Sequence, residues 1–215
     1  MGDFASLFVF IIVFPLVLSS FLKYQPGACV DGVHNLLRID STEDVTLPIQ
    51  LRDVQILFYD IYNKTSCHEG RPNLKMPGYV KFIAGEMHVF RHIENFDQID
   101  VQPTISFMHL FLCRGGISPV PMFPNRFCNF KLSKYIPEHY TDILRNQGVH
   151  TIGEMMTKSN FTEVLELPPS VSFFGVTLLR MIRDRYHSEV RMAIEEKPIL
   201  HIKIPSDGGY FYVGY

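Results

Sequence analysis

Residues 53–62 read DVQILFYDIY, and their apolar side chains recur with a period of two. Alternate positions place three residues on each face of an extended chain: Val54, Ile56 and Phe58 on one, and Leu57, Tyr59 and Ile61 on the other. Because side chains alternate between the two faces of a β-strand, this stretch is predicted to be a strand.

The same period recurs on both sides of this stretch. It is present in DVTLPIQL (44–51), in YVKFIAGEMHVFRHI (79–93), where Gly85 is expected to form a bulge, and in DVQPTISFMHLFLC (100–113). Three later stretches are predicted to form a meander: SVSFFGVTLLRMIR (170–183), SEVRMAIEE (188–196) and ILHIKIP (199–205), with RDRYHS and EEKP as the breaks between them. In the middle one, Val190, Met192 and Ile194 alternate with charged residues.

One region departs from this pattern. Ile136, Tyr140, Ile143 and Leu144 follow helical spacing, with Pro137 near the first turn and Gly148 as the expected stop. One or two short helices are therefore expected between β-hairpins. The whole pattern predicts an all-β sandwich or barrel formed by a single domain over residues 24–205. The Gly- and Tyr-rich residues 206–215 are expected to be a flexible tail.

Composition limits the partner classes. The chain has 215 residues, 47% of them hydrophobic, and a formal net charge of -2. Nucleic acid is excluded as the main partner because phosphate binding requires a clustered basic surface. The sequence contains no run of like charges, so electrostatic attachment to a membrane is not predicted.

The first residues predict export from the cytoplasm. The uninterrupted apolar run 7–18, followed by Ser19 and Ser20, fits a secretory signal peptide over residues 1–20, and a longer signal anchor is the alternative. NKT at Asn63 and NFT at Asn160 are expected glycosylation acceptors. Secretion, or delivery to the lysosomal lumen, is the predicted location.

The cysteines also fit an oxidising compartment. Cys29, Cys67, Cys113 and Cys128 allow three pairings. Joining Cys113 to Cys128 is the most economical, and this leaves Cys29 for Cys67. No C-x-x-C spacing is present, which disfavours a zinc ribbon or a thioredoxin-type site.

Catalytic and metal-binding patterns are weak. His88 and His92 fall on one predicted strand beside Glu86, but strand residues four apart are separated by about 13 Å, too far to share a metal without bending. Glu138, His139 and Asp142 are expected on a helix surface. No metal site, cofactor or enzymatic activity is predicted, and a hydrolase or metalloenzyme remains the third-ranked reading.

Apolar residues in a turn-rich loop are the stronger signal. The segment LCRGGISPVPMFPNRFCNF (112–130) is bracketed by Cys113 and Cys128, and it contains Val120, Met122, Phe123 and Phe127. Loops normally run over the surface, so these side chains either pack down as a lid or face an apolar partner. Met155, Met156 and Phe161 add to this apolar set after the helical region.

Several stretches resemble the ML lipid-recognition family, and the ganglioside-activator proteins within it. They are LFLC…FCNFKLSKYIPEHYTDIL, ELPPSVSFFGVTLLRMI and EEKPILHIKIPS, together with an opening that reads GACVDGVHNLLRIDSTEDVTLPI. The resemblance implies an immunoglobulin-like two-sheet β-sandwich whose sheets enclose an apolar cavity for acyl chains, with membrane-contacting loops at its mouth. The family's opening cysteine usually pairs with one in the last strand, where this chain has His201, so Cys29 is left to pair with Cys67 or stay free.

The leading functional prediction is a secreted lipid-binding or lipid-transfer/activator protein. Its expected partners are a sphingolipid, phospholipid or fatty-acyl ligand, a transient membrane surface, and a hydrolase or receptor. The alternative is a secreted protein-interaction module with a filled core. The candidate residues of the cavity or its mouth are Phe82, Phe107, Leu110, Leu112, Val120, Met122, Phe123, Phe127, Phe130, Tyr140, Ile143, Leu144, Met155 and Phe173. The sequence leaves open the lipid identity and the oligomeric state.

Overall fold

The computed structural model describes residues 28–42, 44, 46–107, 110–121, 123–134, 141–158, 163–167, 172–173, 176–177 and 183–215. The predictions of a signal peptide over 1–20, of site roles for Met122 and Tyr140, and of glycosylation at Asn160 concern residues outside these ranges. For Phe107 and Phe173, only the backbone is described.

Strands make up most of the regular structure in the described chain, as the predicted all-β class requires. They are β1 (Leu36–Ser41), β2 (Ile49–Asp60), β3 (Cys67–His68), β4 (Arg71–Leu74), β5 (Gly78–Val89), β6 (Asp100–Phe107), β7 (Leu110–Cys113), β8 (Phe130–Lys131), β9 (Gly148–Thr151), β10 (Val164–Leu167), β11 (Ser172–Phe173), β12 (Val176–Thr177), β13 (Asp184–Ile194), β14 (Lys197–Ile204) and β15 (Phe211–Val213). The helical elements are the 3₁₀ turns η1 (Phe96–Gln98), η2 (Asn125–Phe127) and η3 (Leu132–Lys134), and the helices α2 (Thr141–Arg145) and α3 (Ile152–Lys158).

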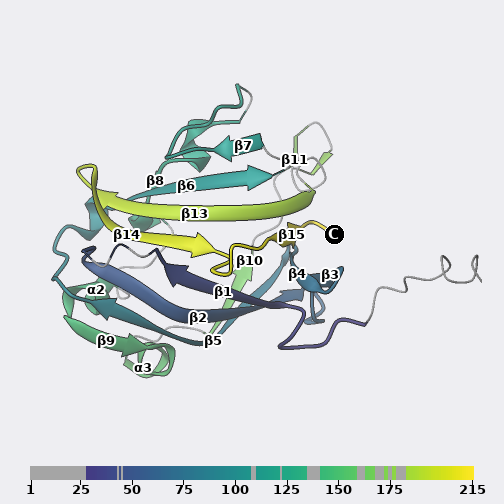
Figure 1. Ribbon diagram of the computed structural model, residues 1–215, viewed down its shortest axis with the longest axis horizontal. Helices are drawn as coiled ribbons and strands as arrows, with labels where there is room; N and C mark the ends of the chain where they lie inside the picture. Colours follow the sequence, from purple (N-terminus) through teal and green to yellow (C-terminus); the bar gives the residue numbers. More distant parts are fainter. Residues whose placement is uncertain are drawn as a thin grey trace, which may run out of the picture.

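Most strands belong to one mixed sheet that curls like a half-barrel. Its order is β10-β5-β2-β1-β14-β13-β15-β4-β3, with β6 beside β13, β7 and β8 beside β6, and β9 beside β5. Strand β1 connects the two halves, because Leu36–Ile39 pair with β2 whereas Asp40 and Ser41 pair with β14. Figure 1 shows β6, β13 and β14 on one side of the molecule and β2, β5 and β9 on the other.

The alternation in β2 has the predicted consequence. Val54, Ile56 and Phe58 are all buried in one apolar cluster with residues from the opposite half of the sheet. This first core consists of Leu37, Val54, Ile56, Phe58, Val80, Leu112, Tyr186, Phe211 and Val213. Burial of each such side chain is worth about 1.5–3 kcal/mol, so the inner faces of the two halves stabilise each other.

A second core fills the end of the molecule that carries η1 and η3. Its buried members are Ile49, Ile93, Phe96, Ile99, Val101, Leu132, Ile199, Leu200 and Ile202. Val190, Met192 and Ile194, the predicted apolar face of β13, pack against this second core.

The predicted bulge at Gly85 is present. Arg52 pairs with Glu86 and Gln55 with Ala84, so Asp53 and Val54 of β2 oppose the single residue Gly85. Gly85 has φ +127°, and a Cβ atom there would lie 2.5 Å from the Cα of Val54. Only glycine allows this conformation and this backbone approach.

The predicted meander is correct for its last two strands and wrong for the first. β13 and β14 form an antiparallel hairpin, and both turn residues, Glu195 and Glu196, have positive φ, as a two-residue hairpin turn requires. The RDRYHS segment (183–188) was expected to be a break between strands, but its residues 184–188 form the first part of β13. Within the described residues, β11 and β12 pair with each other in a separate two-stranded sheet.

The described part of the helical region contains two short helices, the larger of the two numbers that the sequence allowed and one more than the single inserted helix of the simplest predicted fold. Both α2 and α3 are present, and β9 separates them by pairing with β5. Gly148, the expected helix stop, begins β9 with φ +137°.

The expectation of a flexible tail is wrong for residues 211–213. β15 pairs antiparallel with β13 and parallel with β4, and Phe211, Tyr212 and Val213 are buried. The side chain of Asn73 fixes the last residue by donating to the Tyr215 carbonyl at 2.6 Å and accepting from its N–H at 3.2 Å.

Both expected disulfides are present. Cys29 is bonded to Cys67 and Cys113 to Cys128, so no cysteine is free, and His201 lies in β14 beside Glu189 at 3.3 Å. Disulfides persist in secreted and lumenal proteins, which fits the predicted location. Among the described helices, none is long and apolar enough to cross a membrane.

Candidate functional site

The segment that the sequence singled out forms a hairpin at the edge of the sheet. β7 pairs with β6, and Leu110 and Phe111 are 60% and 37% exposed, whereas Leu112 and Cys113 are buried. Cys113 and Cys128 are both fully buried, so their disulfide fixes the base of the loop in the protein interior.

A tight turn follows β7 and presents another apolar residue. Arg114 and Ile117 exchange backbone hydrogen bonds at 2.8 and 3.2 Å across Gly115 and Gly116, which both have positive φ. Glycine supplies this conformation without steric cost. The Gly115 N–H also donates to the Thr104 hydroxyl at 3.0 Å. The turn is thereby held against β6, and Ile117 is left 64% exposed.

The remainder of the loop folds back toward the interior. Val120 packs against the first core, and the half-buried rings of Phe123 and Phe127 lie 5.5 Å apart between centroids. We call Leu110, Phe111 and Ile117 the exposed hairpin patch. It therefore sits on a loop that is anchored from below by apolar packing and by a disulfide.

Arg114 lies against the exposed hairpin patch, and Arg126 lies on the same disulfide-closed loop. The Arg114 guanidinium lies 5.2 Å from the centroid of Phe111, and that of Arg126 lies 5.2 Å from the centroid of Phe127. Lys131 is paired with Asp100 at 2.9 Å. Between residues 101 and 137 the sequence contains no aspartate or glutamate, so the cations of this segment are not neutralised by acidic neighbours in the sequence.

The other predicted site residues lie in several places. Phe82 packs against the first core, and Phe130 and Leu144 pack against the second core. Leu112 and Ile143 are buried at 7% and 8% exposure, and Met155 is half-buried on α3. The structure therefore gathers Leu110, Val120, Phe123 and Phe127 at the hairpin. It places Phe82, Leu112, Phe130, Ile143 and Leu144 along the interior and Met155 on α3. Asn63 is exposed in the turn after β2, and its glycosylation stays a prediction.

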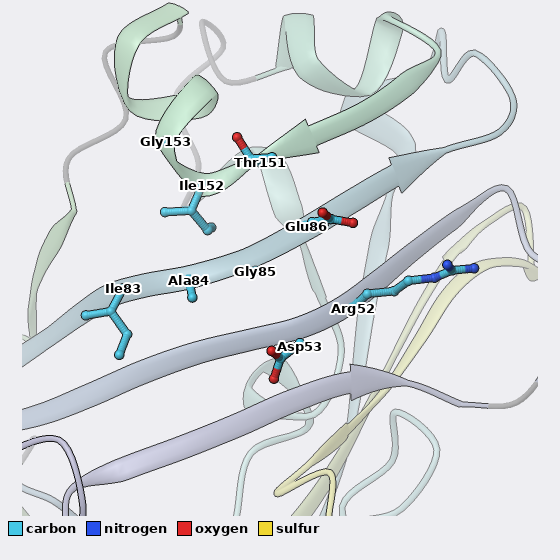
Figure 2. Close-up of a pocket in the computed structure, with 9 residues that line it drawn as sticks. All are labelled: Arg52, Asp53, Ile83, Ala84, Gly85, Glu86, Thr151, Ile152 and Gly153. Carbon is cyan, nitrogen blue, oxygen red and sulfur yellow. The ribbon is translucent and has the colours of Figure 1, made fainter.

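Figure 2 shows a different recess, formed where the Gly85 bulge meets the start of α3. Its volume is about 500 Å³, and its lining includes Arg52, Asp53, Ile83, Glu86, Thr151 and Ile152. This lining mixes charged, polar and apolar groups and contains none of the predicted lipid-contact residues. It does not have the character of an acyl-chain cavity.

The histidines do not form a metal site with the residues that the structure describes. His88 lies in β5 and contacts Glu86 at 2.9 Å, whereas His92 lies beyond the end of that strand. The prediction that the two histidines share one strand is therefore wrong. His92 contacts the carbonyl oxygen of Arg145. Among the described residues, no three His, Cys, Asp or Glu side chains converge.

The clearest pKa changes occur away from the hairpin. Burial raises the pKa of the Tyr186 phenol well above its usual value, with a smaller contribution from the charge of Asp184. Burial also raises the pKa of Tyr212, and its hydrogen bond to Glu69 adds to this effect. Both phenols therefore stay protonated at neutral pH.

The sequence identified the loop but missed Phe111, Ile117 and the loop's two arginines. The missed signal is the stretch without acidic residues, which can be read directly from the sequence. Neither the protein-family models nor the curated proteins contain a match to this chain.

Proposed function

We propose that the protein binds lipid at anionic membrane surfaces and that the exposed hairpin patch is the element that contacts the bilayer. The observation that carries this proposal is the joint exposure of Leu110, Phe111 and Ile117 beside Arg114, with Arg126 on the same disulfide-closed loop. Apolar side chains that enter the interface and cations that attract anionic headgroups are the two terms of peripheral membrane binding.

The magnitudes favour a reversible contact. Full burial of a side chain such as leucine or phenylalanine is worth about 1.5–3 kcal/mol, and a cation near an anionic leaflet contributes about 1 kcal/mol. Three partly inserted side chains and two arginines support transient association, as a protein that collects or delivers lipid requires.

The interior between the two halves of the sheet is the proposed place for an acyl chain. Several apolar side chains pack against the first core yet keep part of their surface accessible: Ile39, Leu51, Leu74, Phe82, Ile105, Val120, Leu167 and Ile204. In the sandwich that the ML resemblance implies, such side chains would border a gap between two sheets. Each CH₂ group transferred into that gap would contribute about 0.8 kcal/mol, without any specific polar contact.

The hairpin and the interior are linked through neighbouring residues. Phe111 is exposed while the next residue, Leu112, belongs to the first core. Val120, on the same loop, also reaches that core. A lipid tail that leaves the bilayer at the exposed hairpin patch would therefore meet the first core within the same loop. Delivery to a hydrolase or receptor in a secretory or lysosomal compartment is the proposed biological use.

Vesicle flotation with the secreted full chain tests the membrane contact. Phosphatidylserine-containing vesicles should bind the wild-type protein, and Ile117→Asp should weaken binding at least ten-fold because a charge replaces an inserted apolar group. Val33→Asp is the matched control, since Val33 is 62% exposed and Ile117 64%, and it should bind as the wild type does. Equal binding by Ile117→Asp and the wild type would contradict the proposed contact.

Native mass spectrometry of the same secreted protein tests the interior. Near-stoichiometric lipid that is extracted by organic solvent would support an acyl-chain site. A clean lipid-free mass, together with vesicle binding no stronger than that of Ile117→Asp, would favour the alternative of a protein-interaction module.

A further inference from the structure

A group of arginines and aromatic rings covers the outer face of β4, β15 and β13. Arg185 is opposite Tyr212 in the β13–β15 pair, and Asn73 is opposite Tyr212 in the β4–β15 pair. Because side chains alternate along strands, Arg71 and Tyr210 fall on this same face, and Phe211 faces the first core. We call Arg71, Arg183 and Arg185, with the tyrosines beneath them, the arginine face.

The guanidinium groups lie over the faces of the tyrosine rings. Arg71 and Arg185 are 4.4 and 5.0 Å from the centroid of the same ring, that of Tyr210. Arg183 lies 4.0 Å from the centroid of Tyr215. A guanidinium that stacks through its flat face keeps the N–H groups on its edges free to donate hydrogen bonds.

Two carboxylates lie near these cations: Glu69 is beside Arg185, and Asp207 is near Arg71, because Asp207 Oδ1 and Arg71 Nη1 each lie 2.9 Å from the position of a Cβ built on Gly209. Glu69 accepts a hydrogen bond from the Tyr212 hydroxyl and lies 3.7 Å from Arg185. In the described part of the chain, no carboxylate forms an ion pair with Arg71 or Arg183. His68 stacks on Tyr215 at 4.1 Å between ring centroids and meets the Tyr212 ring edge-on at 4.6 Å.

The platform beneath the arginines is rigid. Tyr212 is 2% exposed and Asn73 is fully buried, and the hydrogen bonds of Asn73 fix Tyr215. Gly209 leaves space for Arg71 and Asp207, because a Cβ atom at that position would lie 2.9 Å from both Arg71 Nη1 and Asp207 Oδ1. Fixed donors lose less entropy on binding than donors on mobile side chains.

We propose that the arginine face binds a tetrahedral oxyanion, the phosphate or sulfate group of a monoester. Guanidinium edges match the spacing of oxygens on phosphate and sulfate, and two or three such edges around one group form charge-assisted hydrogen bonds. This site goes beyond the membrane contact of the hairpin and does not depend on it, because it uses different residues and a different chemistry.

Isothermal titration of the full chain with inorganic phosphate, sulfate and glucose 6-phosphate is the direct test. Wild-type protein is expected to bind the monoester, with affinity that falls as salt rises. Arg71→Gln combined with Arg183→Gln should weaken binding at least ten-fold. The control pair Arg52→Gln with Arg91→Gln removes the same charge from exposed arginines elsewhere and should bind as the wild type does.

Gly209→Ala separates geometry from net charge. It keeps every charged residue but displaces the ends of Arg71 and Asp207, so weaker binding by this variant shows that the placement of these side chains matters and supports a built site. Absence of wild-type binding at millimolar ligand, or equal weakening by the control pair, would overturn the proposal.

Vesicles that contain phosphatidic acid distinguish a lipid headgroup from a free ester. Binding of both probes that is lost with Arg71→Gln and Arg183→Gln supports the shared chemistry. Vesicle binding that survives these substitutions, without any binding of the soluble ester, would assign the interaction to the hairpin alone and overturn the arginine face as an anion site.

Discussion

Removal of the Cys113–Cys128 disulfide by Cys113→Ala with Cys128→Ala should weaken vesicle binding while the protein stays folded. The two cysteines are separated by 15 residues, and loop-closure entropy for this length gives a loss of about 3 kcal/mol in the free energy of unfolding. Alanine is the appropriate replacement because both positions are fully buried, where a serine hydroxyl would need a partner. Domains with stabilities of roughly 5–15 kcal/mol survive such a loss.

The functional loss follows from what else holds the hairpin. β7 contacts β6 through three residue pairs, Ile105 with Cys113, Ser106 with Phe111, and Phe107 with Leu110. Beyond them, the Asn125 side chain accepts from the Ser118 N–H at 2.7 Å. Without the crosslink, these contacts, the Gly115–Thr104 hydrogen bond and the packing of Val120 would have to order the loop, and the exposed hairpin patch would lose more conformational entropy on each encounter with a membrane.

The other disulfide supplies the control. Cys29 and Cys67 are separated by 38 residues, so Cys29→Ala with Cys67→Ala should cost about 4 kcal/mol, more than the first pair. Its vesicle binding should nevertheless equal that of the wild type below the unfolding transition. Urea denaturation and flotation on the same preparations measure both quantities. If the two variants bound vesicles equally, the disulfide would have no role in presenting the hairpin.

Three further outcomes concern the scaffold. Gly85→Ala should destabilise the protein by more than about 2 kcal/mol in urea denaturation, because φ is +127° and the new Cβ would meet the Val54 backbone at 2.5 Å; a cost below 0.5 kcal/mol would contradict the bulge geometry. Asn35→Ala should cost about 1–3 kcal/mol, since the fully buried amide donates to the Phe58 carbonyl at 3.0 Å, and an unchanged urea midpoint would refute this role. The raised pKa of Tyr186 means that its neutral form is favoured in the folded state, so its stabilising effect is complete below about pH 10 and is lost as pH rises further. Tyr186→Phe should therefore show a shallower fall in unfolding free energy above pH 10 than the wild type, and parallel curves would exclude this linkage.

The features that the sequence predicted correctly depend on neighbours in the chain. Alternation in β2 is local, so the burial of Val54, Ile56 and Phe58 could be read without knowing their partners. The bulge was predicted because Gly85 interrupts a run of β-branched and aromatic residues, and local conformation explains it. The Cys113–Cys128 pair followed from short separation.

The features that were missed depend on distant partners. Residues 211–213 read as a loop by composition, but β15 is stabilised between β13 and β4, and Tyr215 bonds Asn73 across 142 positions. Leu110 and Phe111 are exposed, whereas Leu112 is buried. This difference depends on the register of β7 with β6 and on packing against the first core. The sequence could mark the loop as apolar but could not show which of its residues face water.

The two proposed surfaces lie at the same end of the sheet. Leu110 pairs with Phe107, Phe107 with Tyr186, and Tyr186 with Phe211, so one row crosses β7, β6, β13 and β15. Three steps at the spacing of neighbouring strands make about 14 Å, which is short enough for one membrane to approach both surfaces. If both contact the same bilayer, the free-energy losses of Ile117→Asp and of Arg71→Gln with Arg183→Gln should add on phosphatidic acid vesicles, because the sites share no contacting residues. If the arginine face serves a soluble ester instead, its substitution should leave vesicle binding unchanged and weaken only the titration with glucose 6-phosphate.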